Sequence, residues 1–181
     1  MSHEEIVSIV VVLFAGGYDT TVNLIGNGTL ALLRNPGQLA ALRADPSLLP
    51  NAVEEFLRYD GSANISHWRR TVEPVRVGDV TVPAGEFLFV GIASVSRDPQ
   101  RFAEPDRLDI SRVPAGHLPF GHGIHHCVGA PLARVEGKVA IGRLLARFPH
   151  LSLAADPEKL EWQPSMLHHG LRSLPVRTVP S

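Results

Sequence analysis

The only cysteine of this 181-residue chain lies in a glycine-rich loop. Cys127 stands between Gly123 and Gly129, and the sequence from residue 130 onward has the pattern of a helix. The thiolate is the form of cysteine that binds metals, and a helix N-terminus favours it because its free N–H groups carry partial positive charge. Because glycines allow a flat group or backbone N–H groups to come close to the sulfur, this loop predicts that Cys127 is a ligand.

Two other interpretations of Cys127 stay open when the residues are taken alone. A free intracellular cysteine is most often a small buried apolar side chain. Alternatively, the cysteine forms a zinc site with the three histidines of the same loop, His122, His125 and His126. Zinc ligands usually come as two separated pairs, whereas these four residues crowd into one short loop.

A second candidate site lies inside the first predicted helix, at residues 16–21, which read Gly-Gly-Tyr-Asp-Thr-Thr. Each glycine destabilises a helix by roughly 1 kcal/mol relative to alanine. A threonine in a helix can donate a hydrogen bond to the carbonyl one turn earlier and bend the helix there. The segment is therefore either a glycine-lined helix crossing or a place where the helix opens for a function.

A third pattern is an acidic and a basic residue three positions apart in the predicted helix 48–59. Glu55 and Arg58 share one face of that helix. By itself this spacing indicates only a solvated ion pair that contributes a few tenths of a kcal/mol.

Taken in their order along the chain, residues 16–21, 55–58 and 120–129, the three patterns resemble the cytochrome P-450 family, soluble bacterial type. Phe120, Gly123, His125, Cys127 and Gly129 stand at the fixed positions of the family's haem-binding signature. The resemblance implies that Cys127 is the proximal thiolate ligand of haem iron. It also implies that Phe120 packs beside the cysteine and that His125 faces a haem propionate.

Residues 16–21 resemble the family's oxygen-binding motif in the long helix that crosses the haem face. The resemblance implies that Gly16 and Gly17 leave room for dioxygen and that Asp19 and Thr20 pass protons to it. This role is chemically reasonable because oxygen splitting needs protons delivered into a site that is otherwise kept dry.

The resemblance extends to three arginines. Arg58 belongs with Glu55 to the family's Glu-x-x-Arg pair, and Arg107 matches the second arginine that completes its buried triad. This triad implies a structural role, in which the arginines hold the cysteine loop against the core. Arg69 matches an arginine that faces a haem propionate; the adjacent Arg70 is the alternative, and spacing and strand alternation favour Arg69.

The elements that must position these residues are mostly helical. Helices are predicted at residues 4–34, 37–43, 48–59 and 131–148, and the first is expected to be buried because its first half is apolar almost all round. Strands of one small antiparallel sheet are predicted at residues 70–72, 75–77, 80–82 and 87–90. Residues 98–116 are predicted to be irregular and residues 151–179 to form short extended pieces.

The predicted fold class is mainly α with small antiparallel β-sheets (α+β), in one domain over residues 1–181. By resemblance it is the C-terminal portion of the P-450 fold, from the long distal helix onward. Members of the family are roughly twice as long, so the N-terminal half of the family's fold is absent from this chain.

Composition narrows the possible partners. Hydrophobic residues make up 44% of the chain, charged residues 19%, and the net charge is −1, which is ordinary for a soluble protein and does not favour nucleic acid. The apolar run at residues 6–14 is about half the length needed to span a bilayer, so no membrane is expected. The acidic start of the chain lacks a signal peptide's pattern, and the expected location is cytoplasmic.

The resemblance implies a haem-dependent monooxygenase that inserts one atom of dioxygen into a small apolar organic substrate. The implied cofactor is heme, iron protoporphyrin ligated by cysteine. A ferredoxin-type electron donor is expected because the chain has no flavin or iron–sulfur motif. Apolar residues that could line the substrate site are Leu13, Ile65 and Met166.

Two alternatives to this function remain. The chain is either an active half or a truncated, non-catalytic haem-binding or interaction remnant of such an enzyme. A peroxide-using enzyme on the same fold would not need the relay through Asp19 and Thr20. In each case the apolar face at residues 9–14 predicts a cover, from the missing N-terminal half or from self-association.

Overall fold

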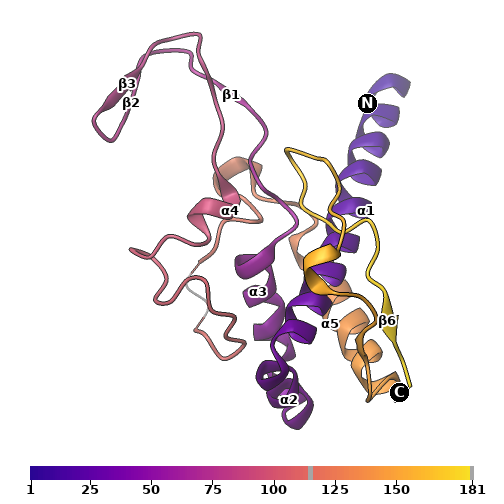
Figure 1. Ribbon diagram of the computed structural model, residues 1–181. Coiled ribbons are helices and arrows are strands. Elements are labelled where there is room, and N and C mark those ends of the chain that lie inside the picture. The colour runs from indigo at the N-terminus through magenta and orange to yellow at the C-terminus, as the bar shows by residue number, and fades with distance from the viewer. Residues whose placement is uncertain (114–115, 180–181) are drawn as a thin grey trace.

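The computed structural model describes residues 1–113 and 116–179 (Figure 1). Its helices and short 3₁₀ turns are α1 (His3–Arg34), α2 (Pro36–Ala44), η1 (Pro46–Leu48), α3 (Leu49–Asp60), α4 (Ile92–Val95), η2 (Gly123–His125), α5 (Ala130–Arg147) and η3 (Pro157–Lys159). Its strands are β1 (Arg69–Arg70), β2 (Val75–Val77), β3 (Val80–Val82), β4 (Phe87–Leu88), β5 (Ser152–Leu153) and β6 (Val176–Arg177). The predicted class, mainly α with small antiparallel sheets, is confirmed. The predicted irregular segment 98–116 is indeed without long elements, although residues 114 and 115 lie outside the described residues.

Both ends of α1 follow from local sequence. The Ser2 hydroxyl accepts a hydrogen bond from the Glu5 N–H at 3.1 Å, and the Glu5 carboxylate accepts one from the Ser2 N–H at 2.7 Å. This reciprocal cap satisfies two donors that the first helical turn leaves free. The helix ends at Arg34, as predicted, where Asn35 and Pro36 stop it. It begins at His3, one residue before the predicted start.

The core lies where the second half of α1 packs against α3 and α5 (Figure 1). Each helix contributes large buried side chains, including Leu24, Phe56 and Ile141. Gly28 allows the close contact between α1 and α3, because a Cβ atom there would lie 2.8 Å from the Phe56 ring. The helices that carry residues 16–20 and the pair of Glu55 and Arg58 are therefore fixed relative to the helix that follows Cys127.

The first half of α1 is exposed, and the prediction that it is buried was wrong. The side chains of Val10, Val12 and Phe14 are 58%, 69% and 74% exposed. Figure 1 shows this indigo end of α1 extending past the other helices. Apolar composition indicates that a segment needs a cover, but it does not indicate whether the same chain supplies one. By length and composition α1 is also long and apolar enough to cross a membrane, and 6% of its most apolar 18-residue stretch is buried. Core helices of soluble proteins can have the same length and composition.

The predicted sheet at residues 70–90 is divided into two separate antiparallel pairs, β1–β4 and β2–β3. The β2–β3 hairpin turns at Gly78, whose φ of 57° is in the left-handed region that glycine tolerates best. The β1–β4 pairing ends before Thr71. The Thr71 hydroxyl donates to the Pro83 carbonyl at 2.6 Å and accepts from the Glu86 N–H at 3.0 Å. The hairpin therefore extends away from the helices (Figure 1).

The tail that follows α5 runs back to α1 and α3. It forms a third antiparallel pair, β5–β6, and two isolated bridges, Ala63–His168 and Trp162–Leu171. Asn27 of α1 anchors the tail, because its Nδ2 donates to the carbonyls of His169 at 3.0 Å and Asp60 at 3.1 Å. This contact brings residues that lie far apart in the sequence to one face of α1.

Candidate functional site

Cys127 lies between η2 and α5, and its side chain is exposed. Its N–H donates to the Phe120 carbonyl at 2.8 Å, and its carbonyl accepts from the Ala130 N–H at 3.2 Å. This exposure contradicts the interpretation of Cys127 as a small buried apolar side chain. The loop instead presents the thiol at the start of the 18-residue helix α5, where free N–H groups favour a negative charge.

Two glycines of this loop are required by its backbone. Gly121 and Gly123 have φ angles of 73° and 72°, in the left-handed region. Gly129 has no such requirement, since an added Cβ would only touch the Cys127 sulfur at 3.8 Å. Within the chain itself nothing demands a glycine there, so the predicted role of Gly129, which is to let a flat group come close, stays a prediction.

The exposed thiol is flanked by exposed apolar side chains. Ile124 and Val128, on either side of it in the sequence, are 97% and 83% exposed. Within the described residues, no three His, Cys, Asp or Glu side chains lie close enough to hold a metal ion together. This finding argues against the zinc alternative with the loop histidines. A single soft sulfur beside apolar side chains suits a metal whose other ligands come with a flat apolar prosthetic group.

A charged cluster connects α3, α5 and the cysteine loop. The Glu54 carboxylate accepts from Arg134 Nε at 2.6 Å and from Arg134 Nη2 at 2.9 Å, and it lies 2.9 Å from His117 Nε2. Burial alone would raise the pKa of Glu54, but the hydrogen bonds and charges of His117 and Arg134 outweigh it and lower the pKa to about 2. The hydrogen bond from Arg134 to Glu54 raises the pKa of Arg134, and a smaller contribution comes from the charge of Cys127.

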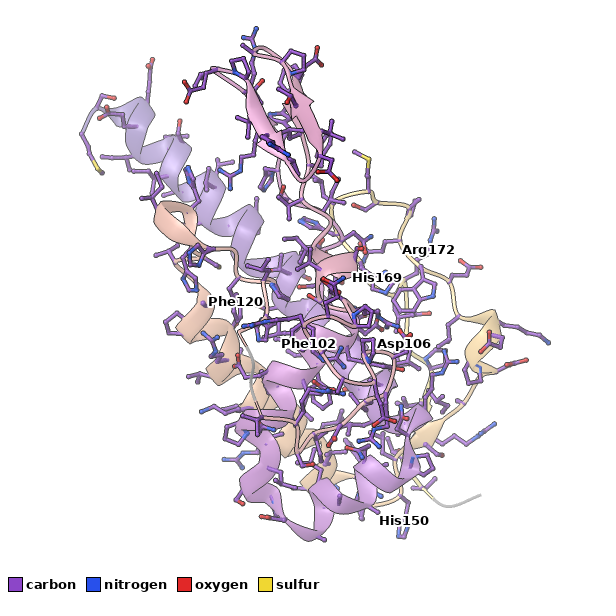
Figure 2. The ribbon with its side chains drawn as sticks, turned by 90° about the vertical axis from the view of Figure 1, so that its left-hand side faces the viewer. Phe102, Asp106, Phe120, His150, His169 and Arg172 are labelled. Atoms are coloured by element: carbon purple, nitrogen blue, oxygen red, sulfur yellow. The ribbon has the colours of Figure 1, made fainter. Side chains whose placement is uncertain are left out.

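Phe120 links this cluster to the cysteine. The ring of Phe120 is buried, and the Arg134 guanidinium carbon lies 4.5 Å from its centroid (Figure 2). A cation over an aromatic face is attracted by the ring's quadrupole. Because the carbonyl of the same residue accepts from the Cys127 N–H, a continuous set of contacts runs from Glu54 to the loop.

The structure pairs Glu55 with Arg58 in the core. Arg58 Nε and Nη2 each donate to the Glu55 carboxylate at 2.8 Å, and the two side chains are 3% and 2% exposed. The remaining donors of Arg58 reach the carbonyls of Ser96, Pro105 and Arg107. Its guanidinium also lies 5.4 Å from the centroid of Phe102 (Figure 2). The pair is thus a buried and fully bonded structural unit rather than the solvated pair that spacing alone indicates.

The prediction that the side chain of Arg107 completes this triad was wrong. That side chain is 59% exposed and pairs with Glu104 and Asp109, and only the Arg107 carbonyl joins the cluster. The second arginine is Arg112, whose Nε donates to Glu55 Oε1 at 3.2 Å. A tight turn explains the difference, because the chain reverses after Asp109 and brings Arg112 over the carboxylate.

The glycine and threonine segment of α1 remains helical. The Thr20 hydroxyl donates to the Gly16 carbonyl at 2.7 Å, the one-turn bond that the sequence suggests. Open space surrounds the positions that side chains at Gly16 and Gly17 would occupy. The carboxylate of Asp19, one position earlier than the threonine, lies 2.9 Å from Nδ1 of His168 in the tail.

The remaining predicted site residues are exposed. Arg69 and Arg70 form β1 and point to opposite faces. Arg70 Nε donates to the Gly85 carbonyl at 3.3 Å, whereas the described residues give the Arg69 guanidinium no hydrogen bond or ion pair. His125 lies at the exposed end of η2.

Sequence patterns did not identify four residues of this region: Glu54, Arg112, His117 and Arg134. Glu54 and Glu55 are adjacent on a helix and so point in different directions, which indicates that each needs its own partner. The adjacent glutamates could therefore have indicated that Glu54 has partners of its own. Those partners, His117 and Arg134, come from distant segments, and no spacing rule predicts them.

Comparisons with known proteins identify the family to which the chain belongs. The sequence model of the family described as Cytochrome P450 matches residues 1–175. The chain is 54% identical over 177 residues to Cytochrome P450 107B1 of Saccharopolyspora erythraea, covering 98% of this chain and 44% of that protein. It is 50% identical to Vitamin D(3) 25-hydroxylase of Pseudonocardia autotrophica, covering 99% and 45%.

Solved structures give the same result. The tirandamycin C-bound P450 monooxygenase TamI superposes with a TM-score of 0.97 and 52% identity, covering 99% of this chain and 45% of that one. The Bacillus subtilis 168 polyketide synthase cytochrome P450 PksS superposes with a TM-score of 0.95 and 40% identity, covering 99% and 46%. The chain thus spans less than half the length of the proteins it matches.

Proposed function

Because the chain belongs to the cytochrome P450 family, we propose that it forms the haem-thiolate part of a monooxygenase, with Cys127 as the proximal ligand of haem iron. The family uses haem as its cofactor. The observation that carries the proposal is the exposed thiol of Cys127 at the start of α5, in a loop whose backbone is tied to Phe120. An exposed single thiol flanked by apolar side chains fits a flat cofactor that brings its own ring nitrogens.

Five further residues would hold the cofactor. Phe120 would pack beside the sulfur, while Gly123 and Gly129 would keep side chains away from the cofactor's face. His125 and Arg69 would bind its carboxylate groups. Arg69 is preferred to its neighbour in β1 because the neighbouring guanidinium already donates to the carbonyl of Gly85, in the turn before β4.

Haem, when bound, supplies the chemistry that activates dioxygen and transfers one oxygen atom to the substrate. The residues of the glycine and threonine segment of α1 would leave room for dioxygen and deliver protons to it. The bare positions at Gly16 and Gly17 would leave room beside the helix. The Asp19 carboxyl, about one-third exposed, would take up protons from solvent, and the Thr20 hydroxyl, bonded to the Gly16 carbonyl, would pass them inward.

The substrate would be a small organic molecule with an apolar body. Leu13 and Met166 are exposed and Ile65 is half-buried, so all three could line its site. Two relatives are named as hydroxylases, Vitamin D(3) 25-hydroxylase and 6-deoxyerythronolide B hydroxylase, and hydroxylation is the proposed reaction. A ferredoxin-type protein would donate the electrons, and the location would be the cytoplasm.

The exposed first half of α1 favours a second candidate, a non-catalytic remnant that binds haem or a partner protein. Nothing in the described residues covers Val12 or Phe14, so the distal side lacks the enclosure from water that oxygen chemistry needs. An N-terminal half or a second copy of the chain would supply this cover in the leading proposal.

The absorption spectrum of the haem-reconstituted chain, reduced and exposed to carbon monoxide, tests the proposal. We expect a strongly red-shifted Soret band that Cys127→Ala abolishes and that Thr20→Ala, on the distal helix, retains. A band typical of histidine ligation, or a band that survives Cys127→Ala, would exclude Cys127 as the ligand. A chain that takes up no haem would favour the interaction remnant.

A further inference from the structure

Three polar residues on one face of α1 lie against the tail. Asp19, Asn23 and Asn27 are spaced four residues apart, so they lie one above another on the helix. Asp19 pairs with His168, and Asn27 donates to the His169 carbonyl at 3.0 Å. Gly170 lies so close to Asn23 that an added methyl group would overlap the Asn23 amide.

The backbone on both sides of His168 is fixed by hydrogen bonds to the segment after α3. The Asn64 N–H donates to the Leu167 carbonyl at 2.9 Å, and the His169 N–H donates to the Ser62 carbonyl at 3.0 Å. The His168 N–H donates to the Ser165 hydroxyl at 3.0 Å. The His168 imidazole therefore contacts Asp19 from a backbone that is held in place by hydrogen bonds.

The adjacent histidine makes a different contact. His169 Nε2 lies 3.0 Å from Asp60 Oδ1, and its ring stacks on Trp162 with centroids 4.0 Å apart (Figure 2). His169 thereby anchors the tail to the end of α3. The contact of His168 with Asp19 is not needed for that anchoring, which suggests a role at Asp19 itself.

We propose that His168 is a positioning residue that holds the Asp19 carboxylate in the conformation from which it delivers protons to Thr20. The proposal rests on the proposed function of Asp19 and adds a residue to the same site. A carboxylate only accepts hydrogen bonds, so His168 Nδ1, 2.9 Å from Asp19 Oδ2, must carry the proton. An aspartate that is about one-third exposed would otherwise exchange among rotamers, and the bond selects one.

The first test needs no haem. Long-range ¹H–¹⁵N spectra of the haem-free chain at alkaline pH report which ring nitrogen of each histidine carries the proton. We expect a protonated Nδ1 for His168 in the unmodified chain and a shift toward the Nε2-protonated form in Asp19→Leu. An unprotonated Nδ1 in the unmodified chain, or no response to Asp19→Leu, would overturn the proposal.

The second test separates positioning from mere folding. His168→Asn places an amide donor close to the position of Nδ1, whereas His168→Ala removes the donor. In the haem-loaded chain supplied with NADH, a ferredoxin and its reductase, we expect His168→Ala to lower NADH consumption by about tenfold, since misplaced proton donors lose much of their effect. We expect His168→Asn to restore most of the rate and His150→Ala, an exposed histidine on a distant surface, to leave it unchanged (Figure 2).

An unchanged rate in His168→Ala, or an equal loss in the Ala and Asn variants, would overturn positioning as the role of His168. The two proposals can fail separately. A chain without the red-shifted carbon monoxide band refutes the haem-thiolate function, and the nitrogen spectra still decide whether His168 holds Asp19.

Discussion

Glu54 and Arg134 form a two-fold hydrogen-bonded ion pair, at 2.6 and 2.9 Å, that joins α3 to α5. Arg134 also lies over the Phe120 ring, and the carbonyl of Phe120 accepts from the Cys127 N–H. A change at Glu54 is therefore transmitted through two contacts to the loop that carries the thiol. The ion pair therefore stabilises the packing of α3, α5 and this loop.

We expect Glu54→Gln to weaken the pH dependence of stability. The pKa of Glu54 is about 2 in the folded chain, against an ordinary value of 4.5. The ionised carboxylate therefore stabilises the folded state above about pH 4.5, and this contribution is lost as the pH falls toward 2. Urea unfolding at pH 7 and pH 3 should show the acid loss reduced by about 2 kcal/mol in the variant.

Glu73→Gln is the matched control, because Glu73 is an exposed carboxylate at the β-hairpin. It should leave the pH dependence unchanged. If the free energy of unfolding falls equally between pH 7 and pH 3 in Glu54→Gln and in the unmodified chain, this contribution to stability does not come from Glu54.

Replacing Arg112 by alanine should lower the free energy of unfolding much more than replacing Arg107 by alanine. The side chain of Arg112 is 14% exposed and bonds to the buried Glu55, so its loss leaves a buried carboxylate with one partner fewer. We expect Arg112→Ala to lower the free energy of unfolding by about 3 kcal/mol. Arg107→Ala removes only exposed ion pairs and should lower it by about 0.5 kcal/mol or less.

Urea titrations of the two variants at pH 7 provide the measurement. A larger loss for Arg107→Ala than for Arg112→Ala would mean that the side chain of Arg107, as the resemblance suggested, completes the buried cluster.

The sequence predicted what is encoded locally. The helix end at Arg34 was predicted from its stop signals, α5 ends at Arg147, one residue before the predicted end, and the one-turn bond of Thr20 follows from its position inside a helix. The buried pair of Glu55 and Arg58 lies within one helical turn, so its spacing was readable. In each case the interacting residues are at most a few positions apart.

The sequence failed where distant segments decide. Arg112 displaced Arg107 because a turn at Asp109 sets which arginine reaches Glu55. An aspartate favours such a turn, but no local pattern indicates that the turn brings Arg112 to a carboxylate 57 residues earlier in the chain. The pairing of Asp19 with His168 joins positions 149 residues apart (168 − 19) and depends on how the tail packs. The exposure of the first half of α1 depends on which surfaces are present to cover it.

Replacing Thr20 should change the yield of hydrogen peroxide more than it changes the free energy of unfolding. Thr20→Val keeps the shape of the side chain but removes the hydroxyl that donates to Gly16. Because such a bond contributes little to helix stability, the free energy of unfolding should change by less than about 0.5 kcal/mol. In the haem-loaded chain with NADH, a ferredoxin and its reductase, the share of electrons recovered as hydrogen peroxide should rise severalfold, whereas Thr20→Ser should keep it low.

Hydrogen peroxide measured against NADH consumed decides this point. Equal peroxide yields for the Val and Ser variants would show that the hydroxyl does not take part in proton delivery.

The exposed apolar half of α1 should make the chain associate with itself. Val10 and Phe14 are 58% and 74% exposed and lie four residues apart on one face of the helix, so contact between two such surfaces would remove both from water. We expect sedimentation velocity to show a sedimentation coefficient that rises with concentration, and Val10→Gln with Phe14→Gln to suppress that rise. Val72→Gln, which replaces a 93% exposed valine outside α1, should not. A chain that stays monomeric at all concentrations would mean that the exposed half of α1 does not drive association, and suppression by Val72→Gln would place the contact on the β1–β4 side instead.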